Sequence, residues 1–414
     1  MTAAMLIAGV RGISAAETAG HWVGTWSAPM AVGNPAERQW PEILGDGNQT
    51  IRQIVHTSIG GTSVRIRLAN TYGDKPLTLH SVFVGLAENG ASIEAGSNHA
   101  VTFGGSPSVS IPAGALALSD AVEITVGSER NLAVSFVPQA AKDSLTVHAS
   151  AMTTNYSGAG DLAKEEANAG FSHTFSSWLY LSGVDVLADA NVKGAVVALG
   201  DSITDGAASK KDENGRWTDV LARRLLAAPA GSVMGVLNEG YGGNNVLTST
   251  PCFAVNAVAR VDRDVLAQTG VRDVILLEGI NDISQPDLAS AGKLPKELMP
   301  CLSQRNVTAA EIIAGYKQII AQVHAMGLKI FGATLPPYKG FTRWTQAGET
   351  KRESINRWIA TSGAYDGVID FAKAVADPND AQRFAAEYDS GDHLHPNTAG
   401  HEAMGKAIDL NLFR

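Results

Sequence analysis

Ser202 lies in residues 197–206, which have the sequence VALGDSITDG, and a short apolar run precedes it. A continuous apolar run of this kind predicts a buried strand, and ligands bind at the carboxyl ends of the strands in open α/β sheets. The start of a following helix would also stabilise negative charge beside the serine. A helix N-cap is the commoner role for a serine after a strand. Ser202 is therefore a candidate nucleophile, with an N-capping role as the alternative.

A base and an orienting acid for this serine occur near the C-terminus, in residues 391–396 with the sequence GDHLHP. A serine hydroxyl is a poor nucleophile until a base removes its proton. Asp392 and His395 are three residues apart, so that on a single turn the carboxylate can orient the imidazole while its other nitrogen faces the serine. Two alternatives stay open: Asp392, His393 and His395 as metal ligands, or polar residues of an ordinary loop.

Donors for the oxyanion of an acyl-transfer reaction are predicted in two further loops. Residues 238–245, NEGYGGNN, follow the second apolar run of the C-terminal half, and glycines there let a backbone N–H approach a ligand closely. Asn281, within the GIND sequence of residues 279–282, follows the third run, and its side-chain amide can donate to an oxyanion. Singly, each is a loop of turn formers. Together with the serine and histidine loops they make a chemically complementary set.

The elements that must position these loops are alternating strands and helices. Apolar runs predict strands at residues 195–199, 233–237, 271–277, 329–334 and 368–369, and helical patterns lie at residues 217–228, 254–268, 308–326 and 350–361. Thr308 with Glu311 predicts a capping box for the third helix. This alternation favours a parallel α/β sheet with helices on both faces.

The N-terminal half has a different pattern. Residues 63–70, 122–126 and 132–136 alternate apolar and polar side chains, with turn formers between the segments. Short strands at this spacing predict a β-sandwich or jelly roll. The predicted organisation is therefore residues 1–20 as a truncated signal or disordered terminus, 21–190 as a β-sandwich-like accessory domain, and 191–414 as the catalytic domain. Residues 152–190, rich in Gly and Ala, are treated as an unassigned connection.

With these motifs in place, the chain resembles the SGNH/GDSL hydrolase family over roughly residues 192–414. The four marker residues of the family fall on Ser202, Gly243, Asn281 and His395, and its triad aspartate on Asp392. The serine motif reads Gly-Asp-Ser-Ile instead of Gly-Asp-Ser-Leu, and Gly-x-Ser-x-Gly occurs around no serine.

The resemblance implies a flavodoxin-like three-layer α/β/α domain and ester hydrolysis without a metal or other cofactor. It also implies an oxyanion hole formed by the N–H groups of Ser202 and Gly243 and the amide of Asn281. Gly243 is the weakest of these assignments, because two other glycines lie in the same loop.

The composition excludes other classes of function. The formal net charge of −9, from 32 Lys and Arg against 41 Asp and Glu, argues against a general nucleic-acid binder, since phosphate contacts need clustered cations. The sequence also lacks the run of about 20 apolar residues that a membrane-spanning helix needs.

Two features indicate export. The apolar stretch Met5–Val10, followed by small residues at Ser14–Ala16, is typical of part of a signal peptide, with a frayed terminus as the alternative. Cys252 and Cys301 each follow a proline and would be bridged in an exported protein; two free thiols are the alternative. We therefore expect a secreted or periplasmic protein, with the cytoplasm as the alternative.

The predicted function is a serine esterase that acts on short acyl groups, acetyl first, of a small-molecule or carbohydrate ester. A lipase or thioesterase for longer chains and a non-catalytic carbohydrate-binding protein are the alternatives. Sugar-stacking or, more simply, core positions are predicted for the aromatic residues Trp22, Trp26, Trp40 and Tyr72. A substrate-pocket position is predicted for Tyr338, Phe341 and Trp344. The sequence does not define the oligomeric state.

Overall fold

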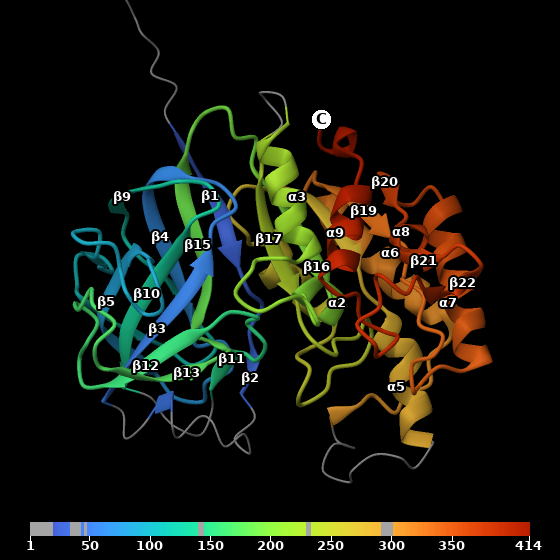
Figure 1. The fold of residues 1–414 in the computed structure, drawn as a ribbon, viewed down its shortest axis with the longest axis horizontal. Helices are drawn as coiled ribbons and strands as arrows, with labels where there is room; N and C mark the ends of the chain where they lie inside the picture. The colour runs from blue at the N-terminus through green and yellow to red at the C-terminus, as the bar shows by residue number, and fades with distance from the viewer. Residues whose placement is uncertain (1–19, 34–42, 45–47, 140–144, 229–232, 291–300) are drawn as a thin grey trace, which may run out of the picture.

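The computed structural model describes residues 20–33, 43–44, 48–139, 145–228, 233–290 and 301–414, which form a β-rich region followed by an α/β half (Figure 1). Strands predominate from β1 (His21–Ser27) to β15 (Leu181–Ala188), and parallel strands alternate with helices from β16 (Ala195–Gly200) onward. The architecture changes between Ala188 and Ala195. We therefore propose that the two domains meet here, which agrees with the predicted ranges 21–190 and 191–414. The predicted N-terminal signal, within residues 1–20, lies almost wholly outside the described residues.

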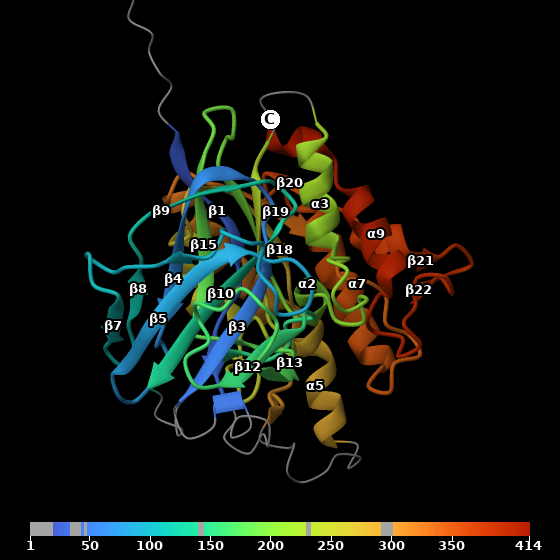
Figure 2. The same cartoon turned by 60° about the vertical axis from the view of Figure 1, so that its left-hand side comes forward.

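Two antiparallel sheets make up most of the described β-rich region. The first contains, in order, β1, β15, β4 (Gly61–Ala69) and β8 (Leu116–Leu118), with β9 (Val122–Val126) also paired to β4. The second contains β13 (Phe171–Phe175), β12 (Asn155–Ala159), β3 (Gln49–His56), β10 (Asn131–Gln139), β5 (Leu77–Leu86) and β6 (His99–Ala100), with β7 (Ser108–Ile111) paired to β5. A small third sheet contains β14 (Trp178–Leu179), β11 (Thr146–His148) and β2 (Ala31–Val32). Figure 2 shows β3, β10 and β5 side by side.

Alternating apolar side chains hold the first two sheets together. The inward residues of β4 and β10 are fully buried in one apolar core: Val64, Ile66, Leu68, Leu132, Val134 and Phe136. Because successive side chains of a strand point to opposite faces, this alternation buries one face of each sheet. The structure confirms the β-rich N-terminal region that the sequence predicts.

Residues 152–190 are more regular than expected. They contain β12, β13, β14 and β15, and β15 pairs with both β1 and β4. Ala and Gly are depleted in strands and give a weak alternating pattern, so that the sequence does not reveal these strands. Their positions in the sheet are decided by pairing with strands from the start of the chain.

The parallel sheet of the α/β half has the order β17 (Gly235–Gly240), β16, β18 (Val271–Leu277), β19 (Lys329–Ala333) and β20 (Gly367–Ile369). Most of its residues are buried, because helices cover both faces (Figure 1). One face carries α3 (Trp217–Leu226), α8 (Phe371–Val375) and α9 (Thr398–Ala407). The other carries α4 (Ala257–Val261), α5 (Ile280–Ser290), α6 (Ala309–Ala325) and α7 (Gln346–Thr361). The predicted three-layer arrangement is confirmed.

The remaining elements of this half are short. They are α2 (Ser202–Asp205), the π-helix η1 (Asp262–Leu266), the hairpin of β21 (Ala376–Asp377) and β22 (Asp380–Phe384), and the final turn η3 (Leu410–Phe413). The capping box of Thr308 and Glu311 is present at the start of α6, as predicted.

Two helix predictions need correction, and one helix was missed. The helix expected at 254–268 is shorter and is completed by η1, and the helix expected at 350–361 already begins at Gln346. The helix α5, which contains Pro286, was not predicted. Proline in a helix interior removes a hydrogen bond and clashes with the preceding turn, so sequence patterns argue against a helix there.

The two regions share an interface at β17, the edge strand of the parallel sheet. β1 packs against β17, and the Val236 N–H donates to Ser58 Oγ at 2.9 Å. Buried apolar residues of both regions belong to one continuous core. None of the helices in the described ranges has the length and apolar character needed to span a bilayer.

Candidate active site

Ser202 begins the short helix α2 directly after β16, at the carboxyl edge of the parallel sheet. The N-cap of this helix is Asp201, whose side chain accepts the Ile203 N–H at 2.9 Å. The alternative role of Ser202 as the N-cap is therefore wrong. Because the first N–H groups of a helix have no intrahelical acceptor, the N–H of Ser202 is available to a ligand.

The structure brings Ser202, His395 and Asp392 into one line of hydrogen bonds. Ser202 Oγ lies 2.8 Å from His395 Nε2, and His395 Nδ1 lies 2.5 Å from Asp392 Oδ2. When the Nδ1–H donates to the carboxylate, Nε2 is left to accept from the hydroxyl. This is the geometry that a serine nucleophile and its base require.

His393 forms a separate pair. Its Nδ1 lies 2.5 Å from Asp389 Oδ2, so its ring is engaged away from His395. Within the described ranges, no three His, Cys, Asp or Glu side chains form a group that could hold a metal ion. The metal-ligand alternative for Asp392, His393 and His395 therefore has no support in their geometry.

The environment of Asp392 favours its charged form. Burial alone would raise the pKa of this carboxyl, but the His395 imidazole and the N–H groups of Leu394 and His395 outweigh burial and hold the pKa well below its usual range. An ionised Asp392 keeps the imidazole oriented and stabilises the imidazolium when it forms.

Gly243 adopts a conformation that needs glycine. Its φ is +75°, and a Cβ at this position would lie 2.5 Å from the Phe253 ring. Within the part of the chain that the structure describes, the Gly243 N–H meets no acceptor, whereas the Gly242 N–H donates to Asp205 Oδ2 at 3.1 Å. Gly240 ends β17. Among the three glycines of the loop, Gly243 is therefore the one with an N–H left for a ligand.

Asn281 lies in the first turn of α5 and not, as expected, in a loop. Its Nδ2 donates to the Asn244 carbonyl at 2.9 Å. An amide nitrogen has two protons, so one remains for a further acceptor. The contact with Asn244 places Asn281 beside the loop that contains Gly243.

Gln285, one helical turn after Asn281, holds the same loop and was missed in the sequence. Its Nε2 donates to the Gly243 carbonyl at 2.8 Å, and its Oε1 accepts the Ser303 N–H at 2.8 Å. Because residues four apart share a helix face, the spacing from Asn281 is the signal that would have found it.

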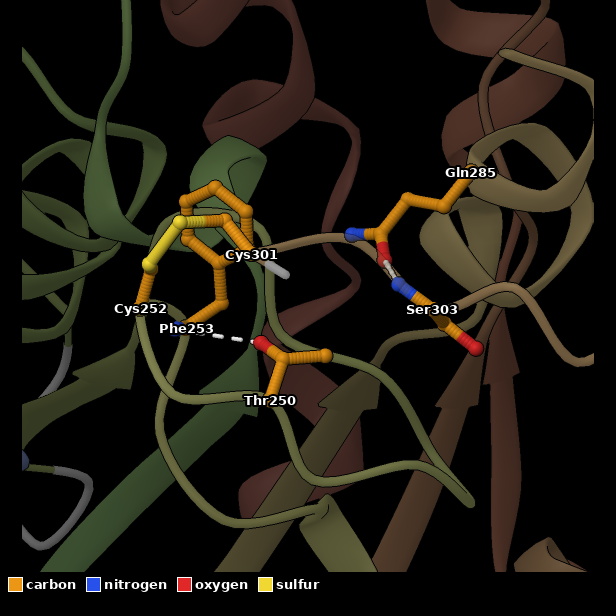
Figure 3. Close-up of a disulfide and its surroundings, with 6 residues drawn as sticks. All are labelled: Thr250, Cys252, Phe253, Gln285, Cys301 and Ser303. Carbon is orange, nitrogen blue, oxygen red and sulfur yellow. Dashed lines mark hydrogen bonds between the residues drawn. A yellow bond between two sulfur atoms is a disulfide. The ribbon is translucent and has the colours of Figure 1, made fainter. Parts of the chain in front are cut away.

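A disulfide braces this loop from the other side. Cys252 and Cys301 are bonded, with their Cα atoms 5.0 Å apart. Figure 3 shows the disulfide together with Phe253, Gln285 and Ser303. Phe253, next to Cys252, is the residue whose ring lies against Gly243. The alternative of two free thiols is therefore wrong.

A buried arginine ties the strand ends together beneath the site, and no sequence pattern indicates it. The Arg260 guanidinium donates to the carbonyls of Gly200 and Glu239, both at 2.8 Å, and to Asn244 Oδ1 at 2.9 Å. Gly200 ends β16 and Glu239 is next to the end of β17. One side chain therefore fixes the two strands that precede Ser202 and the donor loop.

Carboxyl groups are buried around this arginine. Burial raises the pKa of Asp201 to about 6, although the charges of His395 and Arg260 oppose the shift. Burial and the Asp201 charge likewise raise the pKa of Glu278, whose carboxylate lies 3.8 Å from the guanidinium. Raised pKa values of clustered carboxyls are common at functional sites.

The structure describes three of the four aromatic residues for which sugar stacking or a core position was predicted. Trp26 is buried and packs edge-on against Trp178 at 4.9 Å, as a core residue. The Tyr72 ring lies 5.4 Å from the Arg263 guanidinium, and the Trp22 ring 4.5 Å from that of Arg65, so that neither ring is a bare stacking platform. Trp40 lies outside the described residues.

The loop of Tyr338, Phe341 and Trp344 lies beside the histidine loop. A Cβ at Gly340 would lie 2.9 Å from the His393 ring. Tyr338 is fully buried, while Phe341 and Trp344 are partly buried against the core. Only the latter two remain candidates to line a pocket.

The five-stranded parallel sheet of the α/β half, with helices on both faces, defines a flavodoxin-like three-layer α/β/α fold. Residues 198–403 match the model of the GDSL-like lipase/acylhydrolase family, and the α/β half of this chain belongs to that family, as the motifs predicted. The protein is therefore a hydrolase that acts on esters.

Solved structures match about half of this chain. They include a GDSL-like lipase from Bacteroides thetaiotaomicron, with 15% identity over 53% of this chain and 87% of that chain and a TM-score of 0.37. An alpha/beta hydrolase from the metagenome of Lake Arreo has 21% identity, coverages of 52% and 93%, and a TM-score of 0.38. A catalytic mutant of an acetylxylan esterase from Geobacillus stearothermophilus has 19% identity, coverages of 55% and 96%, and a TM-score of 0.38. Comparison with curated proteins found no match.

Proposed function

We propose that this protein is a serine esterase in which Ser202 is the nucleophile, His395 the general base and Asp392 the orienting acid. The observation that carries the proposal is the unbroken line of hydrogen bonds, 2.8 Å from Ser202 Oγ to His395 Nε2 and 2.5 Å from His395 Nδ1 to Asp392 Oδ2. The N–H groups of Ser202 and Gly243 and the Asn281 amide are the proposed oxyanion donors.

The reaction has two chemical steps. Ser202 Oγ attacks the ester carbonyl as its proton passes to His395 Nε2, and the carbonyl oxygen becomes an oxyanion. His395 then returns the proton to the leaving alcohol as the carbon–oxygen bond breaks, which gives an acyl-enzyme. A water molecule then attacks the acyl carbon as His395 takes its proton; the bond between the acyl carbon and Ser202 Oγ breaks, His395 returns the proton to Ser202 Oγ, and the carboxylic acid leaves.

The proposed substrate carries a short acyl group, with acetyl as the first choice, on a small molecule or a carbohydrate. The site is open: 44% of the Asp392 side chain and 19% of the His395 side chain are exposed. An open site suits an acyl group presented by a larger molecule, whereas long acyl chains are usually held in an apolar pocket. The Cys252–Cys301 disulfide supports export, because disulfides persist in oxidising compartments.

The test combines Ser202→Ala with an active-serine probe and an ester panel. We expect kcat on p-nitrophenyl acetate to fall by about 10³–10⁶ and labelling by a fluorophosphonate to disappear. A serine exposed on β7, Ser108, supplies the control: Ser108→Ala should keep both activity and labelling. Wild-type turnover in Ser202→Ala would refute the proposal. A series of p-nitrophenyl esters and acetylated sugars then separates a short-chain esterase from a lipase.

A further inference from the structure

His148, at the end of β11, reaches from the β-rich region into the α/β half. Its side chain is buried, and its Nε2 lies 3.0 Å from Asp205 Oδ1. Asp205 is the last residue of α2, three positions after Ser202. The two regions are thus joined by a buried pair of titratable side chains at the helix that carries the serine.

The partners of His148 define its protonation state. Nδ1 lies 3.0 Å from the Pro29 carbonyl oxygen, and Nε2 lies 3.2 Å from the Ser150 carbonyl oxygen as well as near the Asp205 carboxylate. A carbonyl oxygen can only accept, so both ring nitrogens must donate. Only the doubly protonated imidazolium does so, and the contact with Asp205 is therefore an ion pair.

Asp205 also forms a hydrogen bond with the loop that contains Gly243. While Oδ1 accepts from His148, Oδ2 accepts the Gly242 N–H at 3.1 Å. Gly242 is directly followed by Gly243, the proposed oxyanion donor. A shift of the Asp205 carboxylate would therefore turn the peptide that precedes the Gly243 N–H.

We propose that His148 is a positioning residue for ester hydrolysis: through Asp205 it holds the 241–245 loop so that the Gly243 N–H points at the oxyanion. The β-rich region would thereby complete the active site of the α/β half without touching the substrate. This inference rests on the proposed function, because it assigns a purpose to the proposed oxyanion loop.

The surroundings of His148 suit a cation. The centroids of the Trp178 and Tyr241 rings each lie 5.3 Å from the centroid of the imidazole, and aromatic rings can stabilise a nearby cation. The charge of Arg216 acts in the opposite direction and lowers the pKa of His148. Its Nε donates to the backbone carbonyl of Asp205 at 2.8 Å. Other titratable residues line the cavity between the two regions: His56, Glu129 and Asp219.

The pair predicts a direction of pH dependence. Burial alone would lower the pKa of His148, but the charge of Asp205 and the hydrogen bonds to Asp205 and Pro29 outweigh it and raise the pKa above its ordinary value. The imidazolium is then fully present below the ordinary pKa of about 6.5 and is lost as the pH rises through the raised value. The contribution of His148 to turnover should fall in the same direction.

The test compares His148→Gln with a control at the same interface. Glutamine can donate to Asp205 but carries no charge. We expect kcat on p-nitrophenyl acetate to fall by about 10–100-fold, part of the 10²–10³ that loss of an oxyanion donor costs, with KM changed less than about threefold. The advantage of the wild type should shrink as the pH rises, and hydrogen exchange in residues 241–245 should become faster.

Ser58→Ala is the matched control, because it removes another contact between the regions, the hydrogen bond from the Val236 N–H at the far end of β17. It should lower stability and leave kcat and loop exchange within about twofold of wild type. If His148→Gln fails to fold, Asp205→Asn replaces it, since His148 and the Gly242 N–H face different oxygens of Asp205 and an amide has an acceptor at only one of these two positions.

The outcomes separate this inference from the proposed function. If Ser202→Ala is inactive while His148→Gln and Asp205→Asn keep wild-type kcat, pH profile and loop exchange, the positioning role is refuted alone. If Ser202→Ala stays active, the proposed function fails, and the exchange measurement still decides whether His148 orders the loop.

Discussion

The β-rich region and the α/β half each enclose an arginine completely, and the two arginines have different tasks. Arg52 in β3 donates to Ser135 Oγ at 2.8 Å and to the carbonyls of Ala91, Leu162 and Glu165. These acceptors lie on a neighbouring strand and on connecting loops of the same region. Arg260 instead bonds the strand ends and the donor loop that meet at the proposed active site.

This difference shows how the two regions use buried polar groups. In the β-rich region they satisfy loop backbone groups that would otherwise be buried without partners, which costs about 1–3 kcal/mol each. In the α/β half they gather where parallel strands end, because the carboxyl edge of such a sheet is where a site is built. His148 is the exception, since it lies in the first region and acts on the second.

The largest expected effect lies in the α/β half. Asp392→Asn should lower kcat by about 10⁴, as in other serine triads, because the amide favours the wrong imidazole tautomer. Asp389→Asn is the matched control, since Asp389 pairs with His393 in the same loop. Steady-state kinetics on p-nitrophenyl acetate measure both. An equal loss in the two variants would remove the distinction between the two pairs.

Replacing each of the two buried arginines by methionine tests the comparison directly. Arg52→Met and Arg260→Met should each destabilise the protein by about 3–5 kcal/mol, since each leaves buried partners unpaired. Only Arg260→Met should also lower kcat of the folded protein, by about tenfold or more, because a small misplacement of reacting groups is costly. Urea unfolding and kinetics at low temperature measure the two effects. A comparable loss of kcat in Arg52→Met would contradict the division of tasks.

The disulfide offers a third test in the α/β half, where both cysteines of the chain lie. The double variant Cys252→Ser and Cys301→Ser should lose about 2–4 kcal/mol of unfolding free energy, and kcat should fall severalfold as Phe253 loosens over Gly243. Reductant supplies the control: it should bring the wild type to the level of the variant and leave the variant unchanged. A wild type that is insensitive to full reduction would exclude the bracing role.

The smallest expected effect concerns His401, which is buried like His148. Burial lowers the pKa of His401 in α9 to about 4, so the unfolded chain binds more protons than the folded one between about pH 4 and 6.5. Stability present above pH 6.5 is lost as the pH falls through this window, by about 3 kcal/mol at most. This sign is opposite to that of His148.

His401→Gln should flatten this acid slope in urea unfolding measured at several pH values. The control is His173→Gln at an exposed position of β13, which should keep the wild-type slope. An unchanged slope in His401→Gln would show that other groups cause the acid loss of stability.

Much of the α/β half could be predicted because its signals are local. The apolar run 271–277 coincides with β18, and the helix expected at 217–228 begins at Trp217 as α3 does. Ser202, Asp392 and His395 could be proposed from the sequence because each follows or precedes such an element. Residues 152–190 and α5 were not found, since small residues and Pro286 weaken the local pattern.

The chain by itself determined which side chains are available for chemistry and on which sheet edge they meet, because periodicity and the order of strands and helices are local properties. Only the tertiary structure decided that Asp205 takes the Gly242 N–H while, among the described residues, the Gly243 N–H meets no acceptor, that Arg260 joins two strand ends, and that both ring nitrogens of His148 face acceptor oxygens. Each depends on partners far away in the sequence, and a hydrogen bond is made only where folding brings donor and acceptor to within about 3 Å.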